Sequence, residues 1–323
     1  MAGHRVSVAL CTFNGARYLE TQLESIRRQT FQVDEIVVGD DGSADATLAI
    51  LSEARRDFPQ LLILPSIPRA GVTANFERTI AATAGEFVFL CDQDDVWHPD
   101  RVAASLDLFL AHPDVDLVHS DAQLINGDGQ ELPGSLLDRL GADLSIRSAL
   151  ARGDAFDTLM RRNLVTGATV ALRRRLLETA MPFPGAWLHD EWLAILAADR
   201  GTSRMLDRAL ISYRLHGGNE VGAQRITTSV RVSRLLEDRG ARNRRLLARA
   251  RQLADRLPAQ PHGESARAKL RHEEARSSYP RARIRRIAPL LREWRTGRYE
   301  RYGRGVEDVL RDLVQPATAK SAS

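Results

Sequence analysis

The sequence has few cysteines and no long apolar run, and both shortages exclude whole classes of protein. Cys11 and Cys91 are the only cysteines in 323 residues, and each lies in an apolar run typical of a strand. This disfavours a disulfide framework and a cysteine zinc site, so we expect two buried thiols in a reducing compartment. No apolar run reaches the roughly 18 to 20 residues that cross a bilayer.

Two nucleotide-binding signatures are also missing. No G-x-G-x-x-G follows the first apolar run, which argues against a dinucleotide-dependent dehydrogenase. No G-x-x-x-x-G-K followed by Ser or Thr occurs, which argues against a P-loop kinase. The first residues lead into an apolar run rather than a signal peptide, so we expect a cytoplasmic protein without a membrane span.

The net charge of +4 hides an uneven distribution. Residues 1–225 carry 22 Lys and Arg against 31 Asp and Glu, whereas residues 226–323 carry 24 against 11. This split predicts an acidic body, which we place at residues 1–220, and a basic helical region at residues 221–323. The basic region would suit an anionic surface, such as the inner face of the cell membrane.

Apolar runs alternate with helical periodicity over the first part of the chain. Strands are predicted at residues 6–11, 35–39, 61–64 and 86–91, and later at 117–120, 166–172 and 211–215. Strands alternating with helices predict an α/β fold, a mostly parallel sheet with helices on both faces. Residues 130–160 give no clear pattern, and we expect a mobile excursion there.

The basic region has helical periodicity. One helix is predicted from about residue 226 until Pro258 ends it, with an apolar face of Val232, Leu235, Leu236, Leu246, Leu247, Leu253 and Leu257. A second stretch, residues 281–294, resembles an interfacial helix, although Pro289 should limit its length. Its arginines alternate with Ile284, Ile287, Leu290, Leu291 and Trp294. A solvated helix packed on the acidic body is the alternative.

Polar clusters follow three of the predicted strands, at residues 12–14, 40–43 and 92–95. In such sheets ligands bind at the carboxyl ends of the strands, so the clusters should converge. The carboxylates of Asp92, Asp94 and Asp95 suit Mg²⁺ or Mn²⁺. A solvated turn in which Asp94 or Asp95 caps the next helix remains open, as does a turn at Asp40 with Ser43 capping.

These clusters carry a family resemblance. Thr12-Phe-Asn-Gly15, Asp40-Asp-Gly-Ser43 and Asp92-Gln-Asp-Asp95, in this order, resemble the family 2 glycosyltransferases of GT-A fold, which is Rossmann-like. Further motifs resemble a rhamnosyltransferase-like branch: Asp92-Gln-Asp-Asp-Val-Trp97, Thr166-Gly-Ala-Thr169, His189-Asp-Glu-Trp192 and Tyr213-Arg-Leu-His-Gly-Gly-Asn219. The resemblance covers about residues 5 to 220.

The resemblance implies a site for a nucleotide-diphosphate sugar. Phe13 would lie against the base and Asp41 would recognise it, while Asp92 would contact the ribose or the metal. The remaining residues implied for the donor are Thr12, Asn14, Asn75 and Gln93. Asp94 would be the main metal ligand, and His216 would complete the metal or diphosphate site. The arginine that often precedes Asn75 in the family is Ala74 here, and Arg69 or Arg78 would replace it.

The resemblance also implies the chemistry. Asp190 falls at the position of the general base, with Glu191 as the second candidate, and one base implies inversion. The acceptor and sugar pocket would include Trp97, Gly167, Thr169, His189, Glu191 and Trp192. Without the resemblance, residues 189–192 would be the first turn of a helix, with Asp190 capping and Trp192 in the core.

The expected reaction moves L-rhamnose from dTDP-rhamnose, or a hexose from a UDP-sugar, to a glycan or lipid-linked saccharide. The tail motif Gly297-Arg-Tyr-Glu-Arg-Tyr302 resembles the same branch, which works on surface polysaccharides. A nucleic-acid-binding protein is the main alternative, because the tail combines arginines with aromatic residues. The acidic first 225 residues argue against it, and we expect no nucleic-acid partner. A non-catalytic sugar-binding scaffold is the other alternative.

Overall fold

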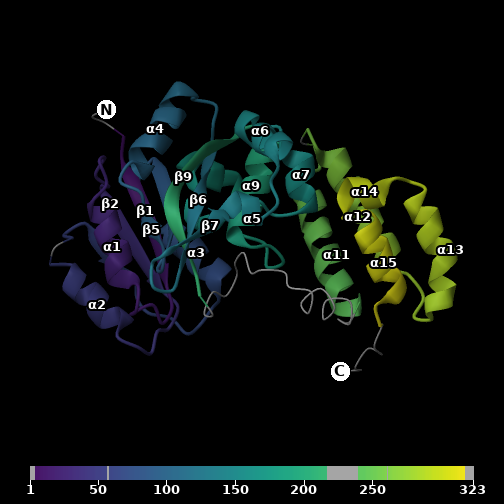
Figure 1. Ribbon diagram of the computed structural model, residues 1–323, viewed down its shortest axis with the longest axis horizontal. Helices are drawn as coiled ribbons and strands as arrows, with labels where there is room; N and C mark the ends of the chain where they lie inside the picture. Colours follow the sequence, from purple (N-terminus) through teal and green to yellow (C-terminus); the bar gives the residue numbers. More distant parts are fainter. Residues whose placement is uncertain (1–3, 57, 217–238, 260, 317–323) are drawn as a thin grey trace. The chain divides into compact units, whose positions relative to one another are not determined.

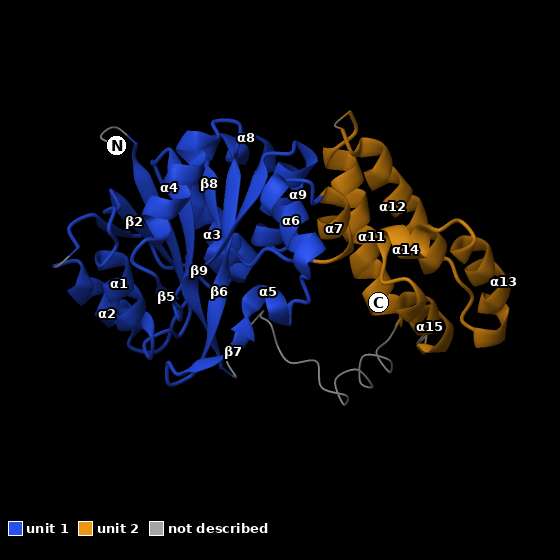
Figure 2. Cartoon of the chain, turned by 45° about the horizontal axis from the view of Figure 1, so that its top comes forward, with its two compact units in different colours: residues 1–155, 163–223 blue, residues 156–162, 224–323 orange. Residues whose placement is uncertain are grey.

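The computed structural model describes the chain except for residues 1–3, 57, 217–238, 260 and 317–323 (Figure 1). The chain divides into two compact units (Figure 2). Unit 1 comprises residues 1–155 and 163–223, and unit 2 comprises residues 156–162 and 224–323.

Unit 1 is built around one sheet. Its strands are β1 (Val6–Thr12), β2 (Glu35–Asp40), β3 (Leu61–Ile63), β4 (Phe87–Asp92), β5 (Val96–Trp97), β6 (Leu117–Asn126), β7 (Glu131–Ser135), β8 (Ala171–Arg173) and β9 (Ser203–Leu215). Its helices are α1 (Leu19–Arg27), α2 (Thr47–Ala54), α3 (Val72–Ala81), α4 (Arg101–Ala111), α5 (Leu136–Arg139), α6 (Leu144–Arg152), α8 (Leu177–Ala180) and α9 (His189–Asp199). Two short 3-10 helices are η1 (Gly167–Thr169) and η2 (Arg174–Leu176).

The sheet is parallel at one end and mixed at the other. Its strand order is β3-β2-β1-β4-β8-β6-β9-β5, and β7 pairs with β6. The strands β3, β2, β1 and β4 are parallel to one another. By contrast, β8 is antiparallel to β4 and β6, and the pairs β6–β7 and β5–β9 are antiparallel. The α/β prediction is confirmed, but the sheet is mixed rather than mostly parallel. The strands β5 and β8 have two and three residues, too few to give a periodicity.

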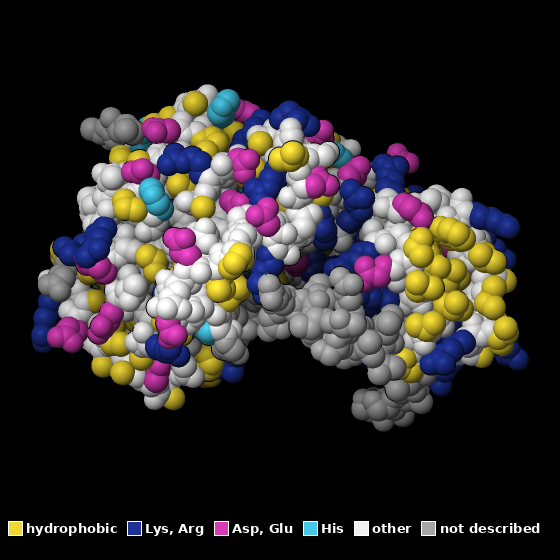
Figure 3. Space-filling view, in the orientation of Figure 1, with side chains coloured by type: hydrophobic (Ala, Val, Ile, Leu, Met, Phe, Trp, Pro, Cys, Tyr) yellow, Lys and Arg dark blue, Asp and Glu magenta, His cyan; other side chains and the backbone are white. Residues whose placement is uncertain are grey.

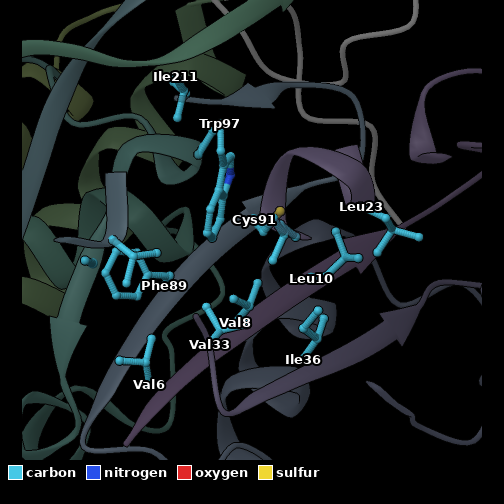
Figure 4. Close-up of a cluster of buried hydrophobic side chains, with 14 of the residues drawn as sticks. Val6, Val8, Leu10, Leu23, Val33, Ile36, Phe89, Cys91, Trp97 and Ile211 are labelled. Carbon is cyan, nitrogen blue, oxygen red and sulfur yellow. The ribbon is translucent and has the colours of Figure 1, made fainter. Parts of the chain in front are cut away.

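Alternation along β1 explains how the sheet is covered on both faces. Val6, Val8 and Leu10 lie in an apolar cluster with side chains of α1, α2 and α4 (Figure 4). On the other face, Sγ of Cys11 lies 3.6 Å from Oγ1 of Thr79 on α3. Both cysteines are buried and free, as predicted.

Residues 130–160, where the sequence shows no clear pattern and a mobile excursion is expected, form regular structure. They contain β7, α5 and α6, followed by α7 (Phe156–Arg161), which belongs to unit 2. Ser135 and Asp138 form a reciprocal capping box at the start of α5, and Asp143 caps α6 through the N–H of Ile146. Gly153 ends α6 with a left-handed backbone, φ 81°. These caps, rather than apolar periodicity, define the segment.

Unit 2 is helical. Besides α7 it contains α11 (Arg239–Arg256), α12 (Gly263–Ser277), α13 (Arg283–Trp294), α14 (Arg298–Tyr302) and α15 (Val306–Val314). α11 ends before Pro258, as predicted, whereas Val232, Leu235 and Leu236 lie outside the described residues. α13 continues through Pro289, which removes one helical hydrogen bond without ending the helix, so the predicted limit is wrong. No helix in the described part of the chain is both long and apolar enough to cross a membrane.

The interior of unit 2 is charged. Arg276 is 1% exposed, and its Nε donates to Oδ2 of Asp312 at 2.6 Å. The hydroxyl of Tyr299 donates to the same oxygen at 2.8 Å. Nδ1 of His272 lies 2.7 Å from Oε1 of Glu293. Ion pairs and hydrogen bonds therefore join α12, α13, α14 and α15.

Candidate active site

The loops after three strands meet at one edge of the sheet. β1, β2 and β4 are parallel, with Thr12 opposite Asp40 and Cys11 opposite Asp92. The polar clusters that follow these strands therefore lie side by side, as expected for a parallel sheet.

Gln93 ties the loop after β4 to the loop after β1. The N–H of Phe13 donates to Oε1 of Gln93 at 2.8 Å, and Nε2 of Gln93 donates to the carbonyl oxygen of Phe13 at 2.9 Å. Gly15 is needed beside this pair, because a Cβ there would lie 2.0 Å from Oε1 of Gln93. Asn14 has a left-handed backbone, φ 47°, and its Oδ1 accepts from the N–H of Ala44 at 2.8 Å. These contacts fix the backbone that carries Phe13.

Asp40 closes the turn after β2. Its Oδ2 accepts from Oγ1 of Thr12 at 2.8 Å and from Oγ of Ser43 at 2.5 Å. Ser43 donates within the turn, and the N-cap residue of α2 is Ala46, so the alternative in which Ser43 caps this helix is wrong. Thr12 is 2% exposed, and its side chain positions this turn.

Asp41 holds the segment before α3. Its two carboxylate oxygens accept from the N–H groups of Ala70 and Gly71 at 2.6 and 3.0 Å. In the same segment, the guanidinium carbon of Arg69 lies 4.0 Å from the centre of the Phe13 ring. A carboxylate, an aromatic ring and a cation are thus gathered at this end of the sheet.

Asn75 is an internal residue of α3. It is 2% exposed, its Nδ2 donates to the carbonyl oxygen of Gly39 at 2.7 Å, and its Oδ1 accepts from Nε of Arg78 at 2.9 Å. Arg78 also donates to the carbonyl oxygen of Asp40 at 2.6 Å. Both residues fasten α3 to the end of β2, so the Asn75 amide is hydrogen-bonded within the protein. Of the two candidate arginines, Arg69 lies beside Phe13 and Arg78 lies beside Asn75, so each contacts one predicted site residue.

Negative charge accumulates after β4. The pKa of half-buried Asp92 is raised to about 7, first by burial and then by the charges of Asp94 and Asp190. Asp95 is 1% exposed, and burial, with the charges of Asp94 and Asp92, raises its pKa well above the usual range. Oδ1 of Asp95 accepts from the N–H of Arg214 at 2.9 Å, but Oδ2 has no hydrogen-bond partner. Such a group of carboxylates favours a bound cation.

Arg101 is a buried positive charge close to these carboxylates. It is 1% exposed, its guanidinium carbon lies 3.8 Å from the centre of the Trp97 ring, and its Nη2 donates to the carbonyl oxygen of Leu90 at 3.1 Å. Burial lowers the pKa of Arg101 to about 10, while Asp95 and Asp92 act in the opposite direction. The helix that follows begins at Arg101 after an Asp100 N-cap, so neither earlier aspartate caps it.

His216 meets Asp94 at the end of β9. Its Nε2 lies 2.8 Å from Oδ2 of Asp94, and the two side chains are 19% and 15% exposed. Nε of Arg214 donates to the carbonyl oxygen of Asp94 at 2.7 Å, which fastens β9 to the acidic loop. Within the described ranges, no three His, Cys, Asp or Glu side chains form a complete metal cluster. The pair nevertheless fits Mg²⁺ or Mn²⁺, because such ions take few protein ligands and complete their shells with phosphate oxygens and waters.

Asp190 lies in the first turn of α9. Its Oδ2 accepts from the N–H of Gly167 at 2.9 Å, and its Oδ1 accepts from the N–H of Glu191 at 2.7 Å. A Cβ at Gly167 would lie 2.8 Å from Nε2 of His189, so glycine permits this close approach. His189 is 5% exposed and stacks on Phe76 with ring centres 3.9 Å apart, and burial lowers its pKa to about 3. The N-cap of α9 is Leu188, so Asp190 is not its N-cap.

Three residues expected in the acceptor pocket are buried in the structure. Trp97 is 3% exposed and packs in the apolar cluster, and Trp192 is fully buried, with its Nε1 donating to the carbonyl oxygen of Ala180 at 2.8 Å. Thr169 is 4% exposed and donates to the carbonyl oxygen of Thr166 at 2.8 Å. The family motifs implied ligand contacts for these residues, and in the structure their partners are internal. Glu191 is half-buried.

Sequence reasoning missed Tyr18, Arg101 and Arg214. The ring of Tyr18 lies 5.1 Å from that of His216 and 4.6 Å from the guanidinium carbon of Arg214. Arg214 was detectable in principle, because an arginine in a buried strand beside His216 needs an acidic or carbonyl partner. Tyr18 gave no such signal, since it matches an ordinary apolar position of a helix.

The fold and the site together define an α/β protein whose polar loops gather at the carboxyl edge of its sheet, where such sheets bind ligands. Residues 7–165 match the model of the family described as Glycosyl transferase family 2. Residues 7–165 therefore belong to this family of glycosyltransferases, as the motifs predicted.

Relatives and solved structures agree with this assignment. An uncharacterized glycosyltransferase, alr2836 of Nostoc, is 28% identical over 230 residues, which cover 67% of this chain and 66% of the relative, slightly less than two thirds of its length. The dTDP-rhamnosyl transferase RfbG of Shigella flexneri is 27% identical over 220 residues, covering 66% and 74%. The mannosyltransferase PcManGT of Pyrobaculum calidifontis, solved with GDP-Man and Mn²⁺, has the same fold, with a TM-score of 0.57 at 20% identity over 96% of this chain and 85% of that one.

Proposed function

We propose that unit 1 transfers a sugar from a nucleotide-diphosphate donor to a hydroxyl group of a glycan or lipid-linked saccharide, with inversion at the anomeric carbon. One observation carries the proposal. Oδ2 of Asp94, in the loop after β4, lies 2.8 Å from Nε2 of His216 at the end of β9, which makes a candidate cation site at the carboxyl edge of the sheet. Burial raises the pKa of Asp92 beside it, and the charges of Asp94 and Asp190 raise this pKa further. A candidate cation site and a candidate base thus act on the same carboxylate.

The donor's base would bind at the ends of β1 and β2. The Phe13 ring offers a stacking surface, and the Asp41 carboxylate can accept an N–H of the base in addition to the backbone N–H groups it already holds. Thymine and uracil both present an imide N–H, so these residues suit pyrimidine nucleotides. Asn14 and Gln93 fix the loop around Phe13.

The donor's diphosphate would bind beside Asp94 and His216, the residues that would hold Mg²⁺ or Mn²⁺, together with Asp92. When bound, such an ion neutralises the negative charge of the departing nucleoside diphosphate. The chain's own contribution is to fix this edge: Arg214 holds the loop of Asp94 through its carbonyl oxygen, at 2.7 Å.

Asp190 would act as the general base. It takes the proton of the acceptor hydroxyl while that oxygen bonds to the anomeric carbon and the bond from this carbon to the diphosphate oxygen breaks. The N–H groups of Gly167 and Glu191 hold its two oxygens, so the carboxylate is oriented before the acceptor arrives. A single displacement inverts the configuration.

Rhamnose from dTDP-rhamnose is the proposed donor sugar, supported by the motifs after β4 and in α9 and by the similarity to RfbG. A UDP-hexose is the second candidate, because Asp41 and Phe13 would serve uracil as well as thymine. Nucleic acid is disfavoured as a ligand of this edge, because its phosphates would meet Asp92, Asp94 and Asp95.

A thermal-shift panel tests the proposal. The full chain is melted with dTDP-rhamnose, UDP-glucose, UDP-galactose, UDP-GlcNAc and GDP-mannose, each with and without Mn²⁺. A ligand at a hundred times its Kd stabilises the folded state by about 2.7 kcal/mol. We expect a Mn²⁺-dependent rise in Tm with one pyrimidine nucleotide sugar. No rise with any donor, at millimolar concentration with Mn²⁺, would refute the proposal.

A further inference from the structure

Two helices of unit 2 carry polar side chains inside and apolar side chains outside. On α13, Arg286 is 1% exposed while Ile284 is 75% exposed. On α15, Asp312 is fully buried while Leu310 is 52% exposed. The exposed apolar residues, which we call the α13–α15 face, include Ile284, Ile287, Leu291 and Trp294 of α13 and Val306 and Leu310 of α15.

The two apolar stripes belong to one surface. α13 packs on α15 within unit 2. Nη1 of Arg286 donates to the carbonyl oxygens of Asp312 and Gln315, at 3.1 and 2.7 Å, which fixes α13 to the end of α15. Figure 3 shows hydrophobic side chains gathered where Figure 1 labels these helices, with Lys and Arg side chains at the margin. Contiguous apolar surface of this kind marks an interaction site.

The charge around this face is mostly positive. Between residues 281 and 314, seven arginines are exposed (Arg281, Arg283, Arg285, Arg292, Arg295, Arg301 and Arg304), against two exposed glutamates (Glu300 and Glu307). At about 100° per residue, Arg283 lies beside one edge of the α13 stripe and Arg295 beside the other, and Arg292 and Arg285 follow Arg295 further round the helix. An apolar stripe bordered by cations on both sides is the pattern of a helix that lies in a membrane interface.

We propose that the α13–α15 face binds the surface of a bilayer that contains anionic lipids. Its apolar side chains would enter the boundary between headgroups and acyl chains, and the bordering arginines would contact lipid phosphates. A second copy of the chain fits less well, because two such faces would bring seven exposed arginines against seven. The inference goes beyond the proposed function and does not depend on it, since none of these residues belongs to the candidate active site.

Vesicle flotation tests the proposal with the full chain. The probes are vesicles of phosphatidylcholine alone and of phosphatidylcholine with a third phosphatidylglycerol. We expect binding to the mixed vesicles that weakens at least about tenfold when Ile284→Asp and Leu310→Asp are combined, since both charges would enter the apolar region. The control Leu144→Asp changes a residue that is 84% exposed on α6 and should leave binding unchanged. Equal binding by the double variant would overturn the proposal.

A second pair of variants tests whether binding requires the arginines beside the apolar face. Arg285→Gln with Arg292→Gln should weaken binding to the mixed vesicles by about fivefold for each arginine. Arg55→Gln with Arg56→Gln, which removes two exposed charges from unit 1, is the matched control. Binding that is equally strong to both kinds of vesicle, or that does not fall with salt, would overturn the anionic part of the proposal.

Tryptophan fluorescence locates the contact. Trp294 is 42% exposed, whereas Trp97, Trp187 and Trp192 are at most 5% exposed. Mixed vesicles should shift the emission to the blue and protect it from acrylamide, and Trp294→Phe should abolish both effects while its Tm stays unchanged. A different set of results would make the face an interface between copies. In that case the parent chain dimerises in sedimentation experiments and binds no vesicles, and Ile284→Asp with Leu310→Asp makes it monomeric. The proposal would then be wrong.

Discussion

Nε2 of His216 lies 2.8 Å from Oδ2 of Asp94, and this contact joins the end of β9 to the loop after β4. The two residues are 122 positions apart in the sequence, so the parallel pairing of β6 and β9 and the antiparallel pairing of β5 and β9 bring them together. If the pair holds the cation, each partner is needed for the donor to bind.

We therefore expect both Asp94→Asn and His216→Ala to weaken Mn²⁺-dependent donor binding by on the order of ten- to a hundredfold. Calorimetric titration of the donor, with and without Mn²⁺, measures the effect. Asp107→Asn, an exposed change on α4, should leave it unchanged. Unaltered affinity in His216→Ala would remove His216 from the site and leave Asp94 as the ligand to be tested.

Asp190→Asn should lower the transfer rate by on the order of a hundred- to ten-thousandfold, because an amide cannot take the acceptor's proton. Donor affinity should change little, since the neutral side chain still accepts the N–H of Gly167. Glu191→Gln is the matched control for the neighbouring carboxylate. If Glu191→Gln loses transfer and Asp190→Asn keeps it, the base is Glu191.

Gly167→Ala should impair transfer through geometry rather than charge. The new Cβ would lie 2.8 Å from Nε2 of His189 and 3.5 Å from Cβ of Asp190, so the candidate base must move. A displacement of this size costs on the order of a hundredfold in rate. Gly185→Ala meets no atom within 4 Å and should behave like the parent enzyme in rate and Tm. An unchanged rate in Gly167→Ala would show that the approach to Asp190 is not critical.

His119 should make the folded chain sensitive to acid. It is fully buried on β6, burial lowers its pKa to about 4, and neither ring nitrogen has a hydrogen-bond partner. In the unfolded chain a histidine titrates near 6.5, so between about pH 6.5 and pH 4 the unfolded state binds a proton that the folded state does not. The free energy of unfolding that depends on neutral His119 is therefore unchanged above pH 6.5. It decreases as the pH falls, by about 3 kcal/mol at pH 4.

Urea unfolding at pH 7, 6 and 5 measures this loss. In His119→Leu, the free energy of unfolding should decrease less steeply with falling pH, by a slope that corresponds to about one proton. His112→Leu, at an exposed position, should keep the slope of the parent chain. Burial also lowers the pKa of His189, to about 3, so His189 contributes equally to the loss of stability at low pH in both variants. Equal slopes in the parent and His119→Leu would contradict the prediction.

The sequence was most informative where one strand alternates with one helix. The runs that became β1, β2 and β4 were predicted nearly to the residue, because parallel strands buried on both faces are continuously apolar. The order of their polar ends then predicted which loops would meet. The family's motifs supplied Asp94, Asp190 and His216, which periodicity alone does not distinguish from capping and loop residues.

The misses have physical causes. Trp97 and Trp192 match family motifs, but their ring burial depends on the packing of α1, α4 and α9, which no local pattern encodes. Arg101 and Arg214 are arginines in buried positions, where composition predicts apolar residues. The charged interior of unit 2 inverts the usual pattern, so periodicity detected its helices without showing which face would be buried.

In α13 and α15 the buried side chains are polar and the exposed ones are apolar, so different residues determine assembly and surface character. The residues that specify how these helices assemble are Arg286, Asp308 and Asp312, whereas Ile284 and Leu310 face outward and contribute little to the assembly. Outward positions can therefore change in size or hydrophobicity while the scaffold stays the same. In the proposed membrane contact, substitutions at these outward positions would change the affinity for the bilayer without disturbing the residues that hold unit 2 together.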